Sequence, residues 1–264
     1  MNVQSGKNKS EKIQTSTLSC VFMIVFHFLH LLKFPLTSVK KQDGEYFDDI
    51  ILYHNNIIFG VGIECKNTNM SQERSCYDDN VSISDSFFTR ITQFSGNGGA
   101  IFVSDSTRSV SIAKSMFYYC SCSSTGGALY FEIANSILRM ICANRCSASN
   151  YQFAYLVASQ MNQVVYTSVS NCSHTTDGYY SIYLQSGNQR FDNSNSSMNK
   201  AYQVSGIIIW YPSSFTSSQC TFSNNKVSSY ICIYFYYNSG IMSYANIINN
   251  DSPAQYGVVC VNGD

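Results

Sequence analysis

The sequence predicts an all-β protein, a right-handed parallel β-helix (solenoid) of about seven coils of ~26 residues, preceded by an N-terminal apolar helix. Three observations favour this fold. Small and apolar residues recur at a nearly constant spacing over residues 82–264, and no stretch after residue 41 has a helical pattern. Only 12% of the 264 residues are charged and only 3 are proline. That composition is expected where inward columns exclude charge and stacked strands exclude proline.

Residues 1–41 form the first expected segment, a signal peptide or signal-anchor. They carry six lysines and one acid, Glu11, around the apolar run 18–32, which is the arrangement of a secretory signal. Extended to residues 18–36, the run approaches the ~20 residues of a spanning helix, and its end lacks a clear cleavage pattern. We therefore expect a secreted or cell-surface protein, anchored in the membrane by residues 18–36 if they are not cleaved. A buried amphipathic helix is the alternative.

Residues 42–81 form the second expected segment, an N-terminal cap or irregular first coils. The stretch 50–63 reads as short strands, whereas 64–80 is polar and charge-rich, which is typical of a loop. An exported chain with 11 cysteines favours disulfides. We therefore expect Cys65 and Cys76 to staple this loop.

Residues 82–264 form the third expected segment, the parallel β-helix. A small residue recurs at intervals of 28, 26, 27, 25, 26 and 25 residues. The positions one and three residues after it are apolar in every coil, so they share the inward face of a strand, and the position between them faces outward. The small column is Ala100, Ala128, Ala154, Ser181, Gly206, Cys232 and Gly257. The first inward column is Ile101, Leu129, Tyr155, Ile182, Ile207, Ile233 and Val258, and the outward column is Phe102, Tyr130, Leu156, Tyr183, Ile208, Tyr234 and Val259.

A column of Cys and Asn precedes the small residue. It reads Thr92, Cys120, Cys146, Cys172, Asn199, Asn225 and Asn250. Stacked Asn side chains can donate to and accept from the neighbouring coil, and Asn tolerates a tight left-handed bend. Cys is small and easily buried at the equivalent place. In-register side chains run parallel about 4.8 Å apart, which is too wide for disulfide Cβ geometry, so we expect mostly buried free thiols.

Two motifs indicate a family. GGAI at 98–101 and GGAL at 126–129, together with F-x-x-N at 222–225, resemble the repeats of the polymorphic outer membrane proteins, which are similar to repeats in surface proteins of protists. The resemblance covers about residues 82–264. It implies a right-handed β-helix of the pectin lyase-like type that serves as a surface adhesin or passenger protein.

Carboxylates that could carry catalysis are few. Polysaccharide lyases need clustered acids for calcium and a basic residue, and glycoside hydrolases need two or three carboxylates close together. Asp105 and Glu132 could lie one coil apart, with Arg108 in the following turn. We interpret them as solvated turn residues, and we expect no catalytic residues.

The cysteines include one zinc-like spacing. Cys120-x-Cys122 and Cys142-x3-Cys146 would suit a zinc site. Inward repeat positions already explain Cys120 and Cys146, and no His lies nearby. We therefore expect neither a metal site nor a cofactor.

Tyrosines supply the one candidate contact surface. Tyr130, Tyr183 and Tyr234, with Tyr211, Tyr236 and Tyr237 in adjacent turns, could form an aromatic strip that binds proteins or sugars. The alternative is ordinary outward positions filled by good strand formers.

We therefore expect a non-catalytic, adhesin-like interaction module whose partner is a host or cell-surface protein or a glycan. A charged fraction of only 12% excludes a nucleic-acid binder that works through a basic patch. The alternatives are a polysaccharide lyase or glycoside hydrolase on the same scaffold, or a decayed or truncated copy without a stable function.

Overall fold

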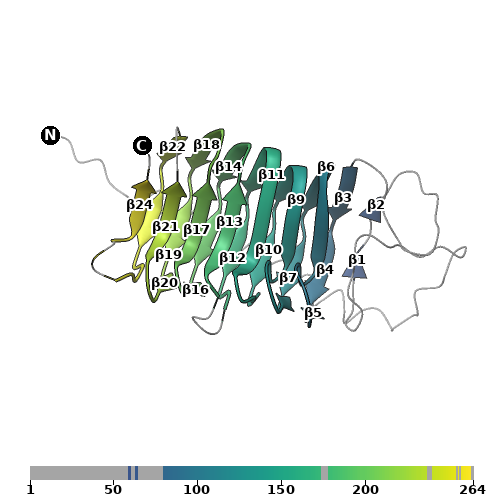
Figure 1. Cartoon of the computed structure of the whole chain (residues 1–264), viewed down its shortest axis with the longest axis horizontal. Coiled ribbons are helices and arrows are strands. Elements are labelled where there is room, and N and C mark those ends of the chain that lie inside the picture. The colour runs from purple at the N-terminus through teal and green to yellow at the C-terminus, as the bar shows by residue number, and fades with distance from the viewer. Residues whose placement is uncertain are drawn as a thin grey trace, which may run out of the picture. The chain divides into compact units, whose positions relative to one another are not determined.

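The computed structural model describes residues 59–60, 63–64, 80–173, 178–236, 240–253, 255 and 257–262. They form an all-β parallel solenoid of about 7 turns (Figure 1), which confirms the predicted class of fold and number of coils. The solenoid belongs to the compact unit Phe47–Asp264.

Several expectations fall on residues outside this description. They are the apolar helix and the membrane anchor within residues 1–41, most of the cap at 42–81, the Cys65–Cys76 disulfide and Tyr237. None of the described residues lies in a helix, so no described helix is long and apolar enough to span a membrane.

The larger sheet has 12 strands; Figure 1 labels β13, β17 and β21 across the middle of the solenoid and β14, β18 and β22 along its top. In its three longest strands a bend separates two paired segments, so residues 101–105 and 109–113 of β6 pair separately with β9. In later coils the two segments are separate strands. The strands are β2 (Ile63–Glu64), β3 (Asn80–Ser84), β6 (Ile101–Ala113), β9 (Leu129–Arg139), β11 (Tyr151–Val165), β13 (Tyr180–Gln185), β14 (Asn188–Asp192), β17 (Val204–Trp210), β18 (Ser214–Ser218), β21 (Ile231–Tyr236), β22 (Gly240–Ser243) and β24 (Val259–Asn262).

The second sheet has 8 strands, most of which are three residues long. They are β1 (Phe59–Gly60), β4 (Ser86–Thr89), β7 (Met116–Tyr118), β10 (Cys142–Asn144), β12 (Ser168–Ser170), β15 (Asn195–Ser197), β19 (Thr221–Ser223) and β23 (Asn246–Ile248). Two further sheets have two short strands each, and each of these strands comes directly after a strand of the 8-stranded sheet. They are β5 (Thr92–Gln93) with β8 (Ser121–Cys122), and β16 (Lys200–Ala201) with β20 (Lys226–Val227). The described pairings are parallel, except that β1 and β2 pair antiparallel with β4 and β3.

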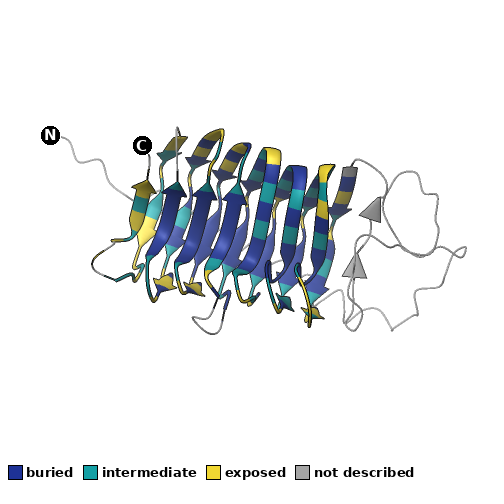
Figure 2. Ribbon diagram, in the orientation of Figure 1, coloured by how far each residue is buried: buried dark blue, intermediate teal, exposed yellow. Residues whose placement is uncertain are grey.

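The core lies inside the coils, where like residues stack in columns. Ile101, Leu129, Ile207 and Ile233 of the first inward column are fully buried. Behind the 8-stranded sheet, the rings of Phe88 and Phe117 stack with centroids 4.8 Å apart. Figure 2 shows β13, β17 and β21 buried along most of their length. Each coil therefore buries its apolar side chains against the coils on either side.

The predicted alignment is wrong by one residue in the third coil. Ala154, not Tyr155, pairs with Leu129, so Phe153 takes the place assigned to the small residue. Phe153 is buried, and its ring centroid lies 6.1 Å from that of Phe117. This coil places its large side chain first and its small one second, so the core volume is preserved although the order of sizes is reversed.

The last coil is also shifted by one residue. Val259 pairs with Ile233, so Val258 replaces Gly257 at the small position and Cys260 replaces Val259 in the outward column. The last coil therefore has no small residue at this position; Val258 stands there and packs against the apolar core.

Two corners in every coil are single residues in the left-handed conformation. Their φ values lie between 47° and 57°, although none is glycine. The conformation costs an L-residue roughly 1–2 kcal/mol. In the second corner, the amide of the corner residue donates to a carbonyl of the next coil, as in Arg90 to Tyr118 at 2.8 Å and Tyr119 to Asn144 at 3.1 Å. The first corner comprises Asp85, Lys114, Met140, Tyr166, Asn193, Gln219 and Tyr244; the second comprises Arg90, Tyr119, Arg145, Asn171, Met198, Asn224 and Asn249.

The Cys and Asn column follows the second corner directly; its members from Cys120 to Asn225 are buried, and Asn250 is half-buried. The amide of Cys172 donates to Oδ1 of Asn199 at 2.9 Å, and that of Asn225 donates to Oδ1 of Asn250 at 3.0 Å. One predicted member is wrong. Buried Ile91, directly after the first coil's corner, holds the position assigned to Thr92.

Candidate functional site

An outward column of the 12-stranded sheet carries a stack of aromatic rings. Successive centroids are 5.1 Å apart from Phe102 to Tyr130, 4.9 Å from Tyr130 to Tyr155 and 5.1 Å from Tyr155 to Tyr183. The pairing places Tyr130, Tyr183 and Tyr234 in this one column, as predicted. Tyr155 stands where Leu156 was expected. The column is therefore more aromatic than the sequence alignment indicated.

Two neighbouring columns extend this surface. The rings of Tyr151 and Tyr180 stack at 5.0 Å, and those of Trp210 and Tyr236 stack at 4.1 Å. Exposed Tyr211 stands edge-on to both Trp210 and Tyr236. We call the whole surface the aromatic face; it comprises Phe102, Tyr130, Tyr151, Tyr155, Tyr180, Tyr183, Trp210, Tyr211, Tyr234 and Tyr236.

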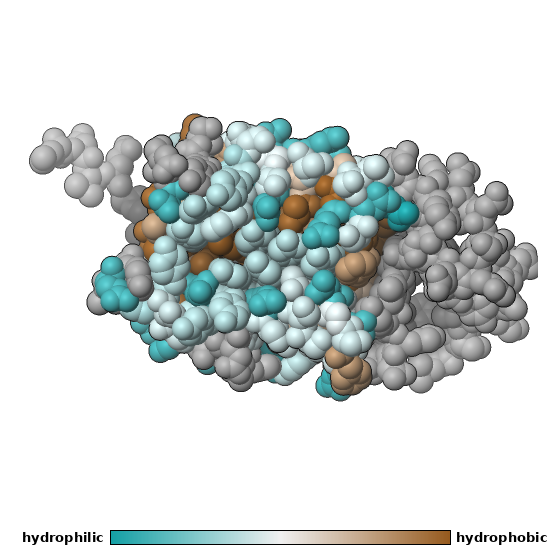
Figure 3. All heavy atoms as spheres, in the orientation of Figure 1, coloured by the Kyte–Doolittle hydropathy of each residue, from teal (hydrophilic) through white to brown (hydrophobic). Residues whose placement is uncertain are grey.

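The aromatic face covers a second apolar cluster outside the solenoid core. Ile208, Val204 and Ile231 point away from the core, yet they are almost completely buried beneath aromatic side chains. Figure 3 shows this face, with hydrophobic side chains visible between pale ones of intermediate hydropathy. Tyrosine rings therefore shield the apolar residues of the outward column.

Stacking covers ring faces in the column, and two of the hydroxyls make hydrogen bonds within the face. The Tyr183 hydroxyl donates to Oε1 of Gln185 at 2.7 Å, and the Tyr180 hydroxyl donates to Oε1 of Gln203 at 2.6 Å. Burial raises the pKa of Tyr183 and that of Tyr151, with a smaller contribution from neighbouring tyrosines. These phenols stay protonated at neutral pH and serve as hydrogen-bond donors.

The two carboxylates considered for catalysis are not brought together. Asp105 pairs with Ile133, whereas Glu132 pairs with Ser104 and accepts a hydrogen bond from its hydroxyl at 2.9 Å. Successive strand residues face opposite ways, so the register separates the two acids.

Asp105 is held within its own turn. Its carboxylate accepts hydrogen bonds from the Thr107 hydroxyl at 2.7 Å and amide at 3.0 Å, and it forms an ion pair with Arg108 at 3.1 Å. The Thr107 hydrogen bonds, with a smaller effect of Arg108, lower the pKa of Asp105. A general acid needs the opposite shift.

The cysteines of the column are free thiols buried in the core, as expected. Cys120, Cys146 and Cys172 carry no disulfide. The thiols of Cys120 and Cys146 lie 3.6 Å and 3.8 Å from the carbonyl oxygens of Phe88 and Phe117. Burial raises the pKa of Cys120 and Cys172. Among the described residues, no group of three or more His, Cys, Asp or Glu side chains could hold a metal ion.

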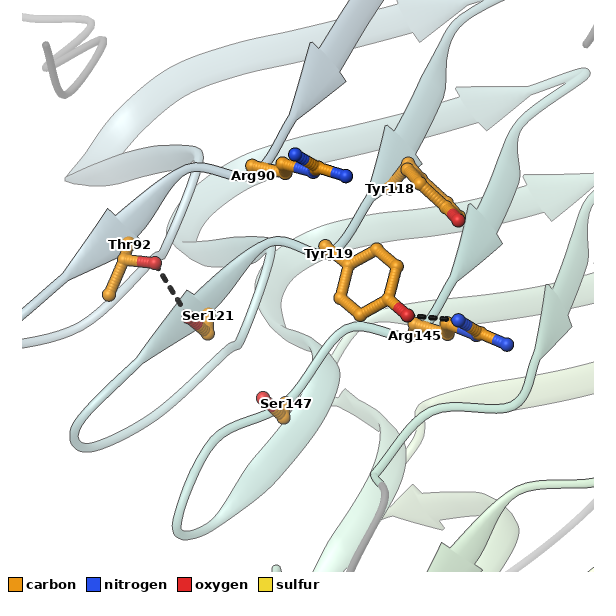
Figure 4. A pocket seen from close by; sticks show the side chains of 7 residues that line it. All are labelled: Arg90, Thr92, Tyr118, Tyr119, Ser121, Arg145 and Ser147. Atoms are coloured by element: carbon orange, nitrogen blue, oxygen red, sulfur yellow. Dashed lines mark hydrogen bonds between the residues drawn. The ribbon is translucent and has the colours of Figure 1, made fainter. Parts of the chain in front are cut away.

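A hollow of about 630 Å³ lies beside the second corner of the first three coils. Figure 4 shows two arginines and two tyrosines along one side of it, and three hydroxyl residues along the other. The lining residues are Arg90, Thr92, Tyr118, Tyr119, Ser121, Arg145 and Ser147.

Contacts within the hollow fix its shape. The Arg145 guanidinium donates to the Tyr119 hydroxyl and lies 5.1 Å from the centroid of that ring. On the opposite side, the hydroxyls of Thr92 and Ser121 are hydrogen-bonded at 3.1 Å, and Ser121 forms a parallel bridge with Ser147. The corner therefore presents a fixed cation beside a row of hydroxyls.

Sequence reasoning missed this hollow. Arg90, Tyr119 and Arg145 are spaced by 29 and 26 residues, which is the spacing of the repeat. Each directly precedes a buried column residue, so the spacing was the available signal. No single residue type recurs at this spacing, because a corner side chain points outward and differs from coil to coil.

Comparison of the chain with models of protein families, with curated proteins and with solved structures finds no match. The resemblance to polymorphic outer membrane protein repeats therefore rests on the motifs at 98–101, 126–129 and 222–225 alone.

Proposed function

We propose that the protein is a non-catalytic, adhesin-like surface module that binds a protein or a glycan through its aromatic face. The observation that carries this proposal is the stack of outward rings from Phe102 to Tyr183, which lies outside the solenoid core. Tyr and Trp are enriched in binding surfaces because they offer large contact areas at a low cost in entropy.

The geometry favours a protein partner over a sugar that stacks on rings. In the middle of the column, each ring face is covered by the ring of the next coil, as for Tyr130, Tyr155 and Tyr183. The ring edges of the half-buried members Tyr130 and Tyr155 are left for contact, and they suit a flat partner surface.

Export is the second part of the proposal. The basic and apolar segment 1–41 favours a secreted or membrane-anchored protein, with residues 18–36 as the anchor. We further propose right-handed coils of the polymorphic outer membrane protein type, because parallel crossovers are right-handed in about 98% of cases.

Localisation and binding test the proposal together. Antibody against the solenoid should label intact, unpermeabilised cells that produce the protein. Purified full-length protein should bind the surface of target cells, and Tyr155→Ser should weaken that binding severalfold. Tyr244→Ser is the matched control, because Tyr244 is an exposed corner residue outside the aromatic face. Equal loss in both variants, or labelling only after permeabilisation, would contradict the proposal.

The enzyme alternative has less support. Asp105 and Glu132 lie out of register, and hydrogen bonds lower the pKa of Asp105. Cleavage of an acidic or neutral polysaccharide that is lost in Asp105→Asn and Glu132→Gln variants would establish this alternative instead.

A further inference from the structure

We propose that the edge of the solenoid beside the second corner binds a linear acidic glycan, with the hollow of Figure 4 at the centre of the binding track. The track uses other strands than the aromatic face does: β5, β8 and β16, of which β5 and β16 lie along one edge in Figure 1. It therefore goes beyond the proposed function and does not depend on it.

The first argument is the spacing of positive charge. Arg90, Arg145 and Lys200 lie in the first, third and fifth coils of this edge, and all three are exposed. Coils stack at about 4.8 Å, so successive cations lie two coils, roughly 10 Å, apart along the solenoid axis. Arg90 and Arg145 are corner residues, and Lys200 lies two residues after its corner residue, Met198. In the next coil Lys226 forms an ion pair with Asp251 at 2.9 Å. Such a row matches a linear ligand whose charges repeat along its length.

The second argument is the preorganisation of Arg145. Its backbone is fixed in the left-handed corner at φ 57°, and its side chain is held over the Tyr119 ring by the bond to the phenol oxygen. A guanidinium has five N–H donors in a planar fork. One bond to a neutral hydroxyl leaves donors for a carboxylate or a sulfate, which bind guanidinium in a bidentate manner.

The third argument is the neutral part of the hollow. Its lining residues in the described part of the chain include Thr92, Ser121 and Ser147 but no Asp or Glu. Hydroxyls that both donate and accept suit sugar hydroxyls, and the Tyr118 ring, which also lines the hollow, adds amphipathic contact area. Anionic groups and hydroxyls that alternate along one chain are the chemistry of an acidic polysaccharide.

General attraction for polyanions does not explain such binding. The chain after residue 41 has 10 basic and 15 acidic residues, so its overall field repels anions. Binding must depend on the local row of cations, which makes the proposal testable by single substitutions.

The experiment measures binding of the full-length protein to immobilised heparin, a sulfated glycan, and to polygalacturonate, a carboxylated one. Neutral dextran and inorganic polyphosphate are the comparison probes. We expect binding to at least one acidic glycan, weakened by added salt, and none to dextran. Arg145→Gln should weaken it about tenfold, because a charge-assisted hydrogen bond contributes at least that factor. Arg145→Lys should lie between Arg145→Gln and the native protein, because it keeps the charge and loses the fork.

Arg139→Gln is the matched control. Arg139 lies next to the first corner, 5.9 Å from the centroid of the Tyr166 ring. The Arg139→Gln substitution removes one positive charge, as Arg145→Gln does, but from a neighbouring stretch of the chain. It should therefore leave glycan binding unchanged. Equal loss in both variants, equally tight binding of polyphosphate, or no binding of either acidic glycan would each overturn the proposal. Tyr155→Ser should leave glycan binding intact, so failure of this proposal and failure of the aromatic face can be told apart.

Discussion

The backbone amide of Asn199 donates to Oδ1 of Asn225 in the next coil at 3.1 Å. The side-chain amide of Asn225 donates in turn to the carbonyl of Ser196 at 2.8 Å. One buried side chain thus satisfies two backbone groups of the preceding coil, at the corner where the chain leaves the 8-stranded sheet. Asn250 repeats the arrangement one coil further on.

The first prediction concerns this ladder. Asn225→Ala should lower the free energy of unfolding by about 2–4 kcal/mol, because it leaves the Asn199 amide and the Ser196 carbonyl buried without partners. Chemical denaturation measures the change. Lys226→Gln is the control, since this next residue is exposed and its ion pair with Asp251 lies in solvent. An Asn225→Ala variant as stable as the control would refute a structural role for the ladder.

The second prediction concerns the inward columns. Ile207→Ala should lower the free energy of unfolding by about 2–5 kcal/mol, because Ile207 is fully buried and the truncated side chain leaves a cavity between stacked coils. Ile241→Ala is the matched control, since Ile241 lies in β22 with 68% of its surface exposed. Equal effects in the two variants would mean that the inward columns do not hold the coils together.

Sequence reasoning could predict the solenoid because its inward columns repeat a residue class. Ile101 and Leu129 fill the same place in successive coils, and their spacing is visible without a structure. It failed in the third coil because the core constrains volume and not the order of residues. Phe153 and Ala154 exchange the sizes of the small and inward positions, so an alignment on small residues slips by one.

The same contrast holds for the two candidate sites. Tyr130 and Tyr183 were predictable because outward strand positions follow the repeat. Arg90 and Arg145 were not, because a corner fixes the backbone and leaves the side chain free to vary. Their charges fall into one row only when each corner has been assigned to its coil.

The third prediction concerns corner strain. Met140 has φ 56° in the first corner, and glycine adopts this conformation without the steric penalty. Met140→Gly should therefore be neutral or stabilising, by up to about 1 kcal/mol, although glycine gains entropy in the unfolded chain. Thermal unfolding measures it, with Ser111→Gly in β6 as the extended-strand control that should destabilise. Clear destabilisation by Met140→Gly would show that the side chain contributes more than the corner costs.

The fourth prediction concerns alkaline pH and the aromatic face. Burial raises the pKa of Tyr151, Tyr155, Tyr180 and Tyr183 above the ordinary value of 10.0. In the unfolded chain these phenols ionise near pH 10, whereas in the folded chain they hold their protons. The resulting stability is complete below pH 10 and is lost as the pH rises from 10 through the folded pKa values.

Tyr183 makes this dependence testable at one residue. The native protein should unfold at progressively lower temperature as the pH is raised above 10, and Tyr183→Phe should flatten that decline because it removes one of the ionising groups. At pH 8 the same variant should be slightly less stable, since it loses the hydrogen bond to Gln185. Tyr244→Phe is the control, because Tyr244 is 77% exposed. An alkaline decline that is identical in all three proteins would mean that the stacked tyrosines ionise as freely in the fold as in water.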